Sequence, residues 1–192
     1  MATDTILLVM DMINDLVHPD GPAAKSYGVT CRDRSVYDNT AVAIARAREA
    51  GFMVGYVRVG FSADYRECPP NSPVFSAARK NGMFKLSSWG TEVYEAFRPQ
   101  EGDPDFVKHR VSPFYGTALE PVLRANGIRR LLLAGVSTNG VVSAAVREGH
   151  DRDYACVLLE DCCAGSTPEE HDFALAGLRR YATVTTAKDF VI

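Results

Sequence analysis

The chain has 192 residues, of which 46% are hydrophobic, and carries a net charge of −3. This length and apolar content predict one domain spanning 1–192 with a sizeable core. The slightly acidic balance argues against nucleic acid as a partner. No apolar run approaches the roughly 18 residues of a membrane-spanning segment, and the first residues lack the pattern of a signal peptide.

The cysteines indicate a reducing environment. Their number, five, is odd, and their spacing contains no CxxC or metal-ligand pattern. Two of them, Cys162 and Cys163, are adjacent, which suits an ordinary disulfide poorly. We therefore expect a cytoplasmic protein.

Strands alternate with helices along most of the chain. In chain order, the pattern predicts strand 5–11, helix 35–51, strand 52–59, strand 105–110, helix 116–127, strand 128–136, helix 138–149, strand 154–161, helix 167–181 and strand 182–190. This alternation predicts a three-layer α/β/α fold around a mainly parallel sheet of about six strands. The broken pattern over 60–104 predicts a long loop that carries function or covers a site.

Three predicted strands end in unusual polar residues. Asp11 closes the first strand, Lys108 lies beside apolar Phe106 and Val107, and a polar turn, 137–141, follows strand 128–136. Singly, Asp11 is explained as a turn residue and Lys108 as an edge-strand side chain that reaches solvent. Ligands of such sheets, however, bind beyond the carboxyl ends of the strands. Together these residues predict a catalytic cleft in which the two charges pair from adjacent strand ends.

Three stretches carry a resemblance to a known family: LLVMDMINDLVHPDG (7–21), FVKHRVSPFYGTALEPVLRANGIRRLLLAGVSTN (106–139) and VLLEDCCAG (157–165). They resemble the isochorismatase-like hydrolase superfamily, also called the cysteine hydrolase family, over nearly the whole chain. The resemblance implies the three-layer fold and an Asp-Lys-Cys triad, with Asp11 as general acid/base and Lys108 orienting it. Ile13 stands where the family motif has Gln. The family also commonly forms homo-oligomers, so we expect a dimer or tetramer.

The same resemblance implies a cis peptide at Val136–Ser137 and an oxyanion hole of backbone N–H groups in the following turn. It places the nucleophile two residues after Asn139, where this chain has Val141 preceded by Gly140. Valine cannot attack, ionise or donate a hydrogen bond. The usual thiolate route is therefore closed unless another residue substitutes.

Several residues could substitute for the thiol. Ser137 or Thr138 could attack, although both are more simply explained as helix N-caps. Three cysteines could also reach the cleft. Cys162 and Cys163 are more simply explained as buried, inert thiols at a strand end, and Cys68 lacks a nearby group that lowers its thiol pKa.

Family branches that lack the cysteine offer another route, because an acid alone can start cleavage of a vinyl ether. We therefore predict a hydrolase of a small organic substrate that uses Asp11 and Lys108 without a cysteine nucleophile, at a C–O (isochorismatase-like) or C–N bond. An amidohydrolase with a substitute nucleophile and an inactive binding or scaffold protein are the alternatives.

The substrate pocket is expected to be mainly apolar. Its predicted wall consists of loop aromatics, and these are Phe61, Tyr65, Trp89, Phe114 and Tyr115. A dicarboxylate substrate would need cations, for which the candidates are Arg58 and Arg66, then Arg79 and Lys80. His18 and His109 do not form the metal set of the nicotinamidase branch, so no metal or other cofactor is expected.

Overall fold

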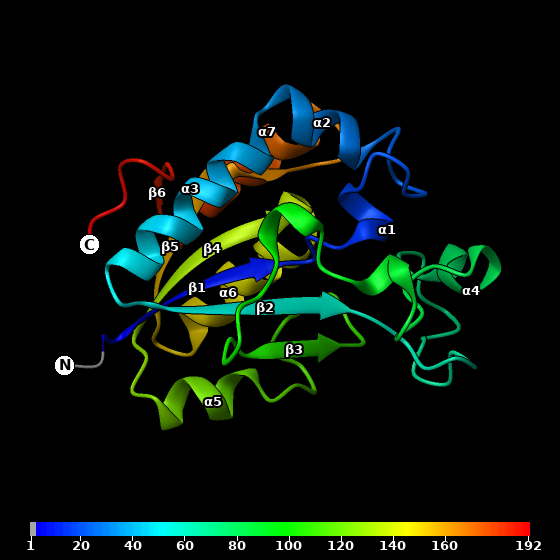
Figure 1. Ribbon diagram of the computed structural model, residues 1–192, viewed down its shortest axis with the longest axis horizontal. Coiled ribbons are helices and arrows are strands. Elements are labelled where there is room, and N and C mark those ends of the chain that lie inside the picture. Colours follow the sequence, from blue (N-terminus) through cyan, green and yellow to red (C-terminus); the bar gives the residue numbers. More distant parts are fainter. Residues whose placement is uncertain (1–2) are drawn as a thin grey trace.

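The computed structural model describes residues 3–192 and contains a six-stranded sheet (Figure 1). The strands lie in the order β3-β2-β1-β4-β5-β6, and all neighbouring pairs are parallel. Their bounds are β1 Thr5–Met10, β2 Met53–Val59, β3 Asp105–Lys108, β4 Arg130–Val136, β5 Ala155–Ala164 and β6 Thr183–Thr185. The predicted six-stranded parallel sheet is confirmed.

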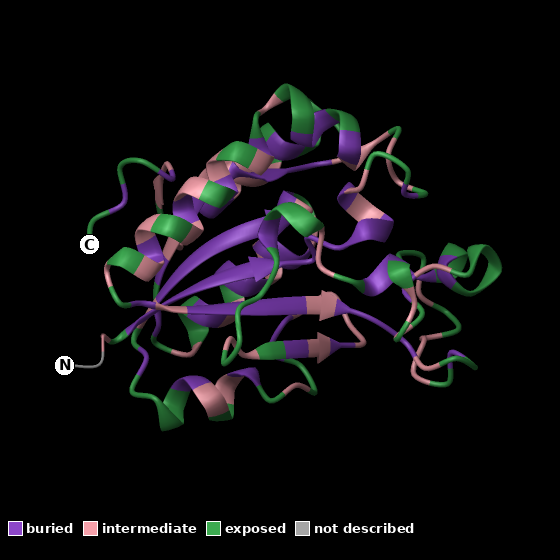
Figure 2. Ribbon diagram, in the orientation of Figure 1, coloured by how far each residue is buried: buried purple, intermediate pink, exposed green. Residues whose placement is uncertain are grey.

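Helices cover both faces of this sheet, which confirms the three-layer α/β/α fold. One core contains Leu7 and Val9 of β1 together with apolar residues of α1 (Asn14–Val17), α2 (Tyr27–Asp33) and α3 (Val36–Glu49). The opposite core contains the alternate residues of β1 and side chains of α5 (Leu119–Ala125), α6 (Ser143–Asp151) and α7 (Pro168–Leu178). Because side chains alternate along a strand, an apolar run such as β1 supplies both cores. Figure 2 shows this central strand buried along its length.

Several predicted boundaries differ from the observed ones. Regular α-helix begins at Ser143 rather than at residue 138, because 138–142 form a wider turn. Strand β5 continues to Ala164, past the predicted end at 161, and its register with β4 shifts between Leu133 and Gly135. The short helices α1 and α2, which lie within 14–33, were not predicted at all.

The predicted long loop over 60–104 contains a short helix, α4 (Ser76–Asn81), and two 3₁₀ turns, η1 (Trp89–Thr91) and η2 (Glu95–Phe97). Figure 1 shows α4 lying beyond the carboxyl ends of the strands. Several hydrogen bonds fasten the segment to the rest of the domain. Among them, Phe84 N–H donates to the Asp15 carboxylate at 2.6 Å, and Tyr94 N–H donates to the Met12 carbonyl at 2.9 Å. The loop therefore has a defined position over the end of the sheet where ligands of parallel sheets bind.

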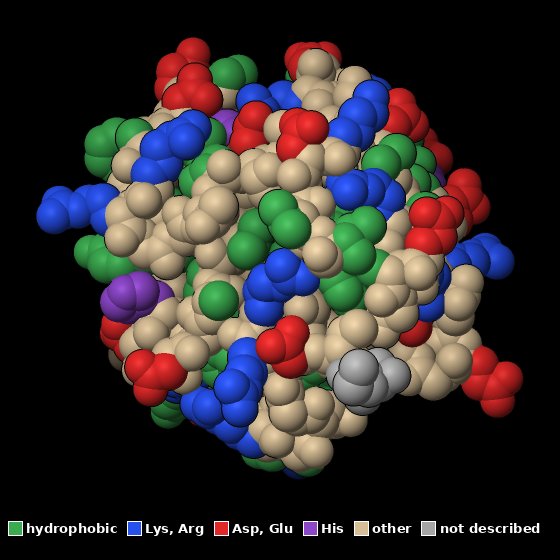
Figure 3. All heavy atoms as spheres, turned by 90° about the vertical axis from the view of Figure 1, so that its left-hand side faces the viewer, with side chains coloured by type: hydrophobic (Ala, Val, Ile, Leu, Met, Phe, Trp, Pro, Cys, Tyr) green, Lys and Arg blue, Asp and Glu red, His purple; other side chains and the backbone are tan. Residues whose placement is uncertain are grey.

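The opposite end of the molecule, at the amino ends of the strands, shows acidic, basic and apolar side chains interspersed (Figure 3). No helix within residues 3–192 has the length and apolar character needed to cross a membrane.

Gly135 lets β4 approach β1 closely at the functional end. Its φ is +153°, and a Cβ placed there would lie 2.3 Å from the carbonyl oxygen of Met10. We expect Gly135→Ala to lower the free energy of unfolding by about 3 kcal/mol, because neither backbone can move aside. Urea denaturation measures this loss.

Gly51 provides the matched control. Its φ is +71°, but no atom lies within 4 Å of a Cβ built there. Gly51→Ala should therefore lower the free energy of unfolding by only about 1 kcal/mol, the cost of placing a Cβ at a positive φ. Equal losses in the two variants would contradict the close-approach explanation.

Candidate active site

Asp11 and Lys108 form a buried ion pair at the carboxyl ends of β1 and β3. The Lys108 Nζ atom lies 2.8 Å from Asp11 Oδ2, and the two residues are 2% and 5% exposed. The pairing predicted from the sequence is therefore present. The two strands are not adjacent, however, because β2 lies between them. The ion pair spans the end of β2, whose last residue, Val59, donates its N–H to Asp11 Oδ1 at 2.7 Å.

The backbone turns sharply at Asp11. Its φ is +55°, in the left-handed region that Asp and Asn enter more readily than most residues. Its N–H donates to the Val57 carbonyl at 2.7 Å, which ties the end of β1 to β2. The carboxylate thus lies beside the end of β2, within reach of Lys108.

The electrostatics of the pair suit proton transfer. Burial raises the pKa of Asp11 above its ordinary value of 3.8, while the Lys108 ammonium and the Val59 N–H act in the opposite direction. A carboxyl whose pKa is raised toward the working pH is a better proton carrier than an exposed one. Lys108 Nζ also donates to the Arg110 carbonyl at 3.1 Å. An ammonium has three N–H bonds, so one remains for a ligand.

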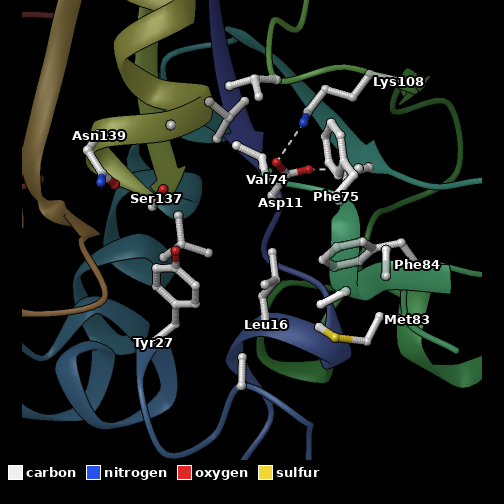
Figure 4. A pocket seen from close by; sticks show the side chains of 18 residues that line it. Asp11, Leu16, Tyr27, Val74, Phe75, Met83, Phe84, Lys108, Ser137 and Asn139 are labelled. Carbon is white, nitrogen blue, oxygen red and sulfur yellow. Dashed lines mark hydrogen bonds and ion pairs between the residues drawn. The ribbon is translucent and has the colours of Figure 1, made fainter. Parts of the chain in front are cut away.

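A cavity of about 430 Å³ opens beside the ion pair (Figure 4). This volume lies within the range of small-molecule sites. Its polar lining comprises Asp11, Lys108, Tyr27, Ser137 and Asn139, and Figure 4 shows Ser137 and Asn139 across the space from the ion pair. The remaining wall is mostly apolar, and it includes Leu16, Val59, Val74, Phe75, Met83, Phe84 and Val111.

The turn after β4 forms one wall of this cavity. The Val136–Ser137 peptide is cis, as the resemblance implied. All four residues predicted for this corner line the cavity, and they are Val136, Ser137, Gly140 and Val141. A Cβ on Gly140 would lie 2.6 Å from Ser137 Oγ, so a glycine lets the turn pass close behind the Ser137 hydroxyl.

Of the described residues that line the cavity, none is a cysteine. Val141 is 3% exposed and packs into the core around β1 and α6. Cys162 and Cys163 are buried on β5, and burial raises the pKa of the Cys163 thiol to about 12. Cys68 is half-buried, with its sulfur 3.9 Å from the Phe75 carbonyl. The cavity therefore holds a proton carrier without a thiol.

The aromatic residues expected in the pocket lie elsewhere. Phe61 is fully buried against Tyr65 and Phe75. Phe114 packs in the core on the α5 and α6 side, stacked on Tyr154. Tyr65 is buried beside Phe61, and the two remaining candidates, Trp89 and Tyr115, are 46% and 66% exposed. The aromatic part of the wall is instead formed by residues of segments 27–33 and 74–84. The position of segment 74–84 beside the cavity depends on the path of the 60–104 loop.

Three of the four cationic candidates bind other groups of the protein. Arg58 pairs with Asp105 through Nε at 2.8 Å and donates to the Thr91 carbonyl at 2.6 Å. Arg66 pairs with Asp64 at 2.7 Å, and Arg79 donates to the Asp64 carbonyl. Lys80 is exposed on α4, and none of these four side chains lines the cavity. A dicarboxylate would find no arginine among the described residues that line the cavity.

The histidines considered for a metal site also have protein neighbours. His109 Nδ1 lies 2.6 Å from the Gly60 carbonyl, and the His18 ring packs edge-on against Trp89. In the part of the chain that the structure describes, no three His, Cys, Asp or Glu side chains gather closely enough to hold a metal ion.

The ion pair should control stability as well as chemistry. We expect Lys108→Met to lower the free energy of unfolding by about 3–5 kcal/mol at neutral pH, because it leaves the Asp11 carboxylate buried and unpaired. Without the ammonium, the folded-state pKa of Asp11 rises further. A raised folded pKa means that stability is lost as pH rises, so the deficit should shrink as pH falls toward 4. Urea denaturation of both proteins at several pH values measures this stability deficit.

The double variant Asp11→Asn/Lys108→Met is the control, since it removes both charges. It should recover most of the stability lost in Lys108→Met and show little of that variant's pH dependence. A deficit in Lys108→Met that does not change with pH would contradict this account of the pair.

Comparison with known proteins identifies the family. Residues 5–189 match the Isochorismatase domain. Ureidoacrylate amidohydrolase RutB from two strains of Methylorubrum extorquens is 30% and 31% identical over 179 residues, covering 87% of this chain and 72% of each relative. N-carbamoylsarcosine amidase from Thermoplasma acidophilum is 27% identical, with a TM-score of 0.76 over 98% of this chain and 99% of the other.

An isochorismatase family protein from Desulfovibrio vulgaris, 25% identical, superposes with a TM-score of 0.84 over 96% of this chain and 94% of the other. The resemblance noted in the sequence is thus confirmed by domain, sequence and structure. The chain belongs to the isochorismatase family of hydrolases.

Proposed function

We propose that this protein hydrolyses a carbonyl C–N bond in a small uncharged substrate, using Asp11 as the proton carrier and water as the nucleophile. The observation that carries the proposal is the buried Asp11–Lys108 pair at the wall of a cavity that no described cysteine lines. The amidohydrolase and amidase named among the relatives support a C–N bond over a C–O bond.

The proposed reaction uses the groups at the cavity wall in turn. Asp11 takes a proton from water, and the water oxygen bonds to the substrate carbonyl carbon. The carbonyl oxygen gains negative charge, which the free N–H of Lys108 and backbone N–H groups of turn 137–141 stabilise. Asp11 then returns the proton to the leaving nitrogen, and the C–N bond breaks to give a carboxylic acid and an amine.

The lining of the cavity supports an uncharged substrate. Lys108 is the one cation among the described lining residues, and the Asp11 carboxylate already compensates its charge. A substrate carboxylate in this space would lose its hydration without gaining an ion pair, which is costly. The same argument disfavours an isochorismate-like dicarboxylate and its vinyl ether bond.

Ser137 is the second candidate nucleophile, because its hydroxyl lines the cavity. The only carboxylate among the described lining residues is Asp11, so Ser137 would depend on the same base. Ser137→Ala distinguishes the two routes, since it should retain turnover if water attacks the substrate directly.

The direct test is hydrolysis of a panel of neutral primary amides, with a neutral enol ether included for comparison. Asp11→Asn should lower kcat by at least about 100-fold, because the amide side chain cannot carry the proton. Iodoacetamide should leave the wild-type rate unchanged, and Cys68→Ser controls for alkylation of the half-buried thiol. Turnover that survives Asp11→Asn would refute the proposed role of Asp11, and absence of turnover across the panel would favour a binding protein.

Val141→Cys supplies a positive control for the thiol reagent. The substitution is close in volume and places a thiol at the cavity wall, on the turn that faces Asp11 and Lys108. Iodoacetamide should label this cysteine and block the cavity, so the variant becomes sensitive to a reagent that the parent resists. Resistance in both proteins would mean that residue 141 does not face the substrate.

A matched pair of amides tests the charge of the substrate. Hexanamide and adipamate differ only in that a carboxylate replaces the terminal methyl group. Wild-type kcat/KM should favour hexanamide by more than about tenfold, because the cavity offers the carboxylate no free cation. Binding measured by ligand-observed NMR gives the same comparison without turnover.

A substitution at Val74 tests whether an added cation shifts the substrate preference toward adipamate. It lines the cavity but is 67% exposed, so a lysine there keeps its hydration. Val74→Lys should improve adipamate about fivefold relative to Val74→Gln, the value of an exposed ion pair. A wild-type protein that already prefers adipamate would refute the uncharged-substrate proposal while leaving the Asp11 chemistry intact.

A further inference from the structure

His171 is a buried titratable side chain that the proposed reaction does not use. It lies on α7, and its side chain is 1% exposed. Its Nδ1 atom is 2.8 Å from Oγ1 of Thr138, which is itself fully buried. Thr138 belongs to the turn after β4, so this bond joins α7 to the wall of the cavity.

Thr138 faces away from the cavity while its neighbours face into it. Ser137 precedes it, Asn139 and Gly140 follow it, and all three line the cavity, whereas Thr138 does not. Gly140 has non-helical backbone angles, with φ −105° and ψ −108°, so regular helical bonding does not hold this turn throughout. The Thr138–His171 bond is therefore an anchor on the side of the turn opposite the substrate.

The surroundings of His171 determine which nitrogen carries the proton. Nε2 is buried without a hydrogen-bond partner among the described residues, and Oε2 of Glu160, on β5, lies 3.8 Å away. An Nε2 lone pair facing this carboxylate would be repelled, so the proton belongs on Nε2. Nδ1 is then an acceptor, and the Thr138 hydroxyl donates to it.

The charges facing His171 are consistent with a neutral ring. Arg34 lies 2.9 Å from Glu160 Oε2 and compensates that carboxylate, so His171 need not be protonated to do so. Burial, followed by Arg34, lowers the pKa of His171, while Glu160 and Asp172 act in the opposite direction. At neutral pH the ring therefore remains an acceptor for Thr138.

We propose that His171 is a positioning residue of the active site, which holds the cavity-lining turn 137–141 in place through the Thr138 hydroxyl. The consequence for catalysis rests on the proposed function, because the turn matters to the rate only if it supplies N–H groups to the substrate carbonyl oxygen. Displacement of such donors by even a fraction of an ångström weakens stabilisation of the transition state more than binding of the substrate.

The first test is spectroscopic and needs no substrate. Imidazole ¹⁵N spectra of the full-length protein between pH 6 and 8 should show His171 with Nε2 protonated and Nδ1 as a hydrogen-bond acceptor. Thr138→Val should shift the Nδ1 resonance, whereas Thr138→Ser should preserve it. A proton on Nδ1, or an Nδ1 resonance insensitive to Thr138→Val, would overturn the proposal.

The second test separates positioning from folding. His171→Leu removes the acceptor, and His171→Asn keeps a polar atom at the place of Nδ1. With hexanamide, His171→Leu and Thr138→Val should each lower kcat by about tenfold or more with KM changed less than about twofold. The double variant should be no worse than either single one, and His171→Asn should restore most of the rate. Unchanged kcat in His171→Leu, or additive losses, would refute the coupling.

A third measurement keeps the two proposals distinguishable if the wild type hydrolyses nothing. In the Val141→Cys background, the rate of iodoacetamide alkylation reports the placement of residue 141 without turnover. His171→Leu should change that rate by more than about threefold, and His171→Asn should not. Identical rates in all three proteins would overturn the positioning role, whatever the outcome for hydrolysis.

Discussion

The structure around the candidate site depends on one buried ion pair, between Asp11 and Lys108. A carboxylate and an ammonium can both remain charged away from water only when they are close and otherwise well bonded. Here Val59 N–H and the Arg110 carbonyl satisfy further bonds of the pair. The pair spans the end of β2: Val59, the last residue of β2, is in register with Lys108 of β3, whereas β1 ends two residues earlier, with Met10 in register with Val57. The cavity opens beside these strand ends, and the proposed chemistry follows from the proton that Asp11 can carry.

Two segments form the polar and the apolar wall of the cavity beside this ion pair. The turn after β4 supplies the polar wall, through Ser137 and Asn139, and it is anchored from behind by Thr138. The loop after β2 supplies the apolar wall and is fastened by Asp15. Val141 stands where the family resemblance places the thiol, so the proposed reaction relies on the Asp11–Lys108 pair and the turn, with water as the attacking group.

Much of the site could be predicted because its residues follow strands. Asp11, Lys108 and the 137–141 turn stand out as polar positions at the ends of apolar runs, and the structure places them at one cavity. The aromatic wall could not be predicted in the same way. Phe61 and Phe114 belong to the same loops as true lining residues, yet Phe61 packs against the lining residue Phe75 without lining the cavity itself, and Phe114 enters the core on the α5 and α6 side. Local sequence does not encode which face of a loop turns inward.

The sequence by itself determined the alternation of strands and helices, the parallel sheet and the pairing of Asp11 with Lys108, since these depend on periodicity and on residue type at strand ends. Its motif stretches also carried the resemblance to the family. Only the tertiary structure decided the strand order, which places β2 between the paired charges. It also decided the occupants of the cavity wall and the contact of His171 with Thr138, 33 residues apart. Such contacts arise from packing between distant segments, whose geometry is a property of the whole fold rather than of any local pattern.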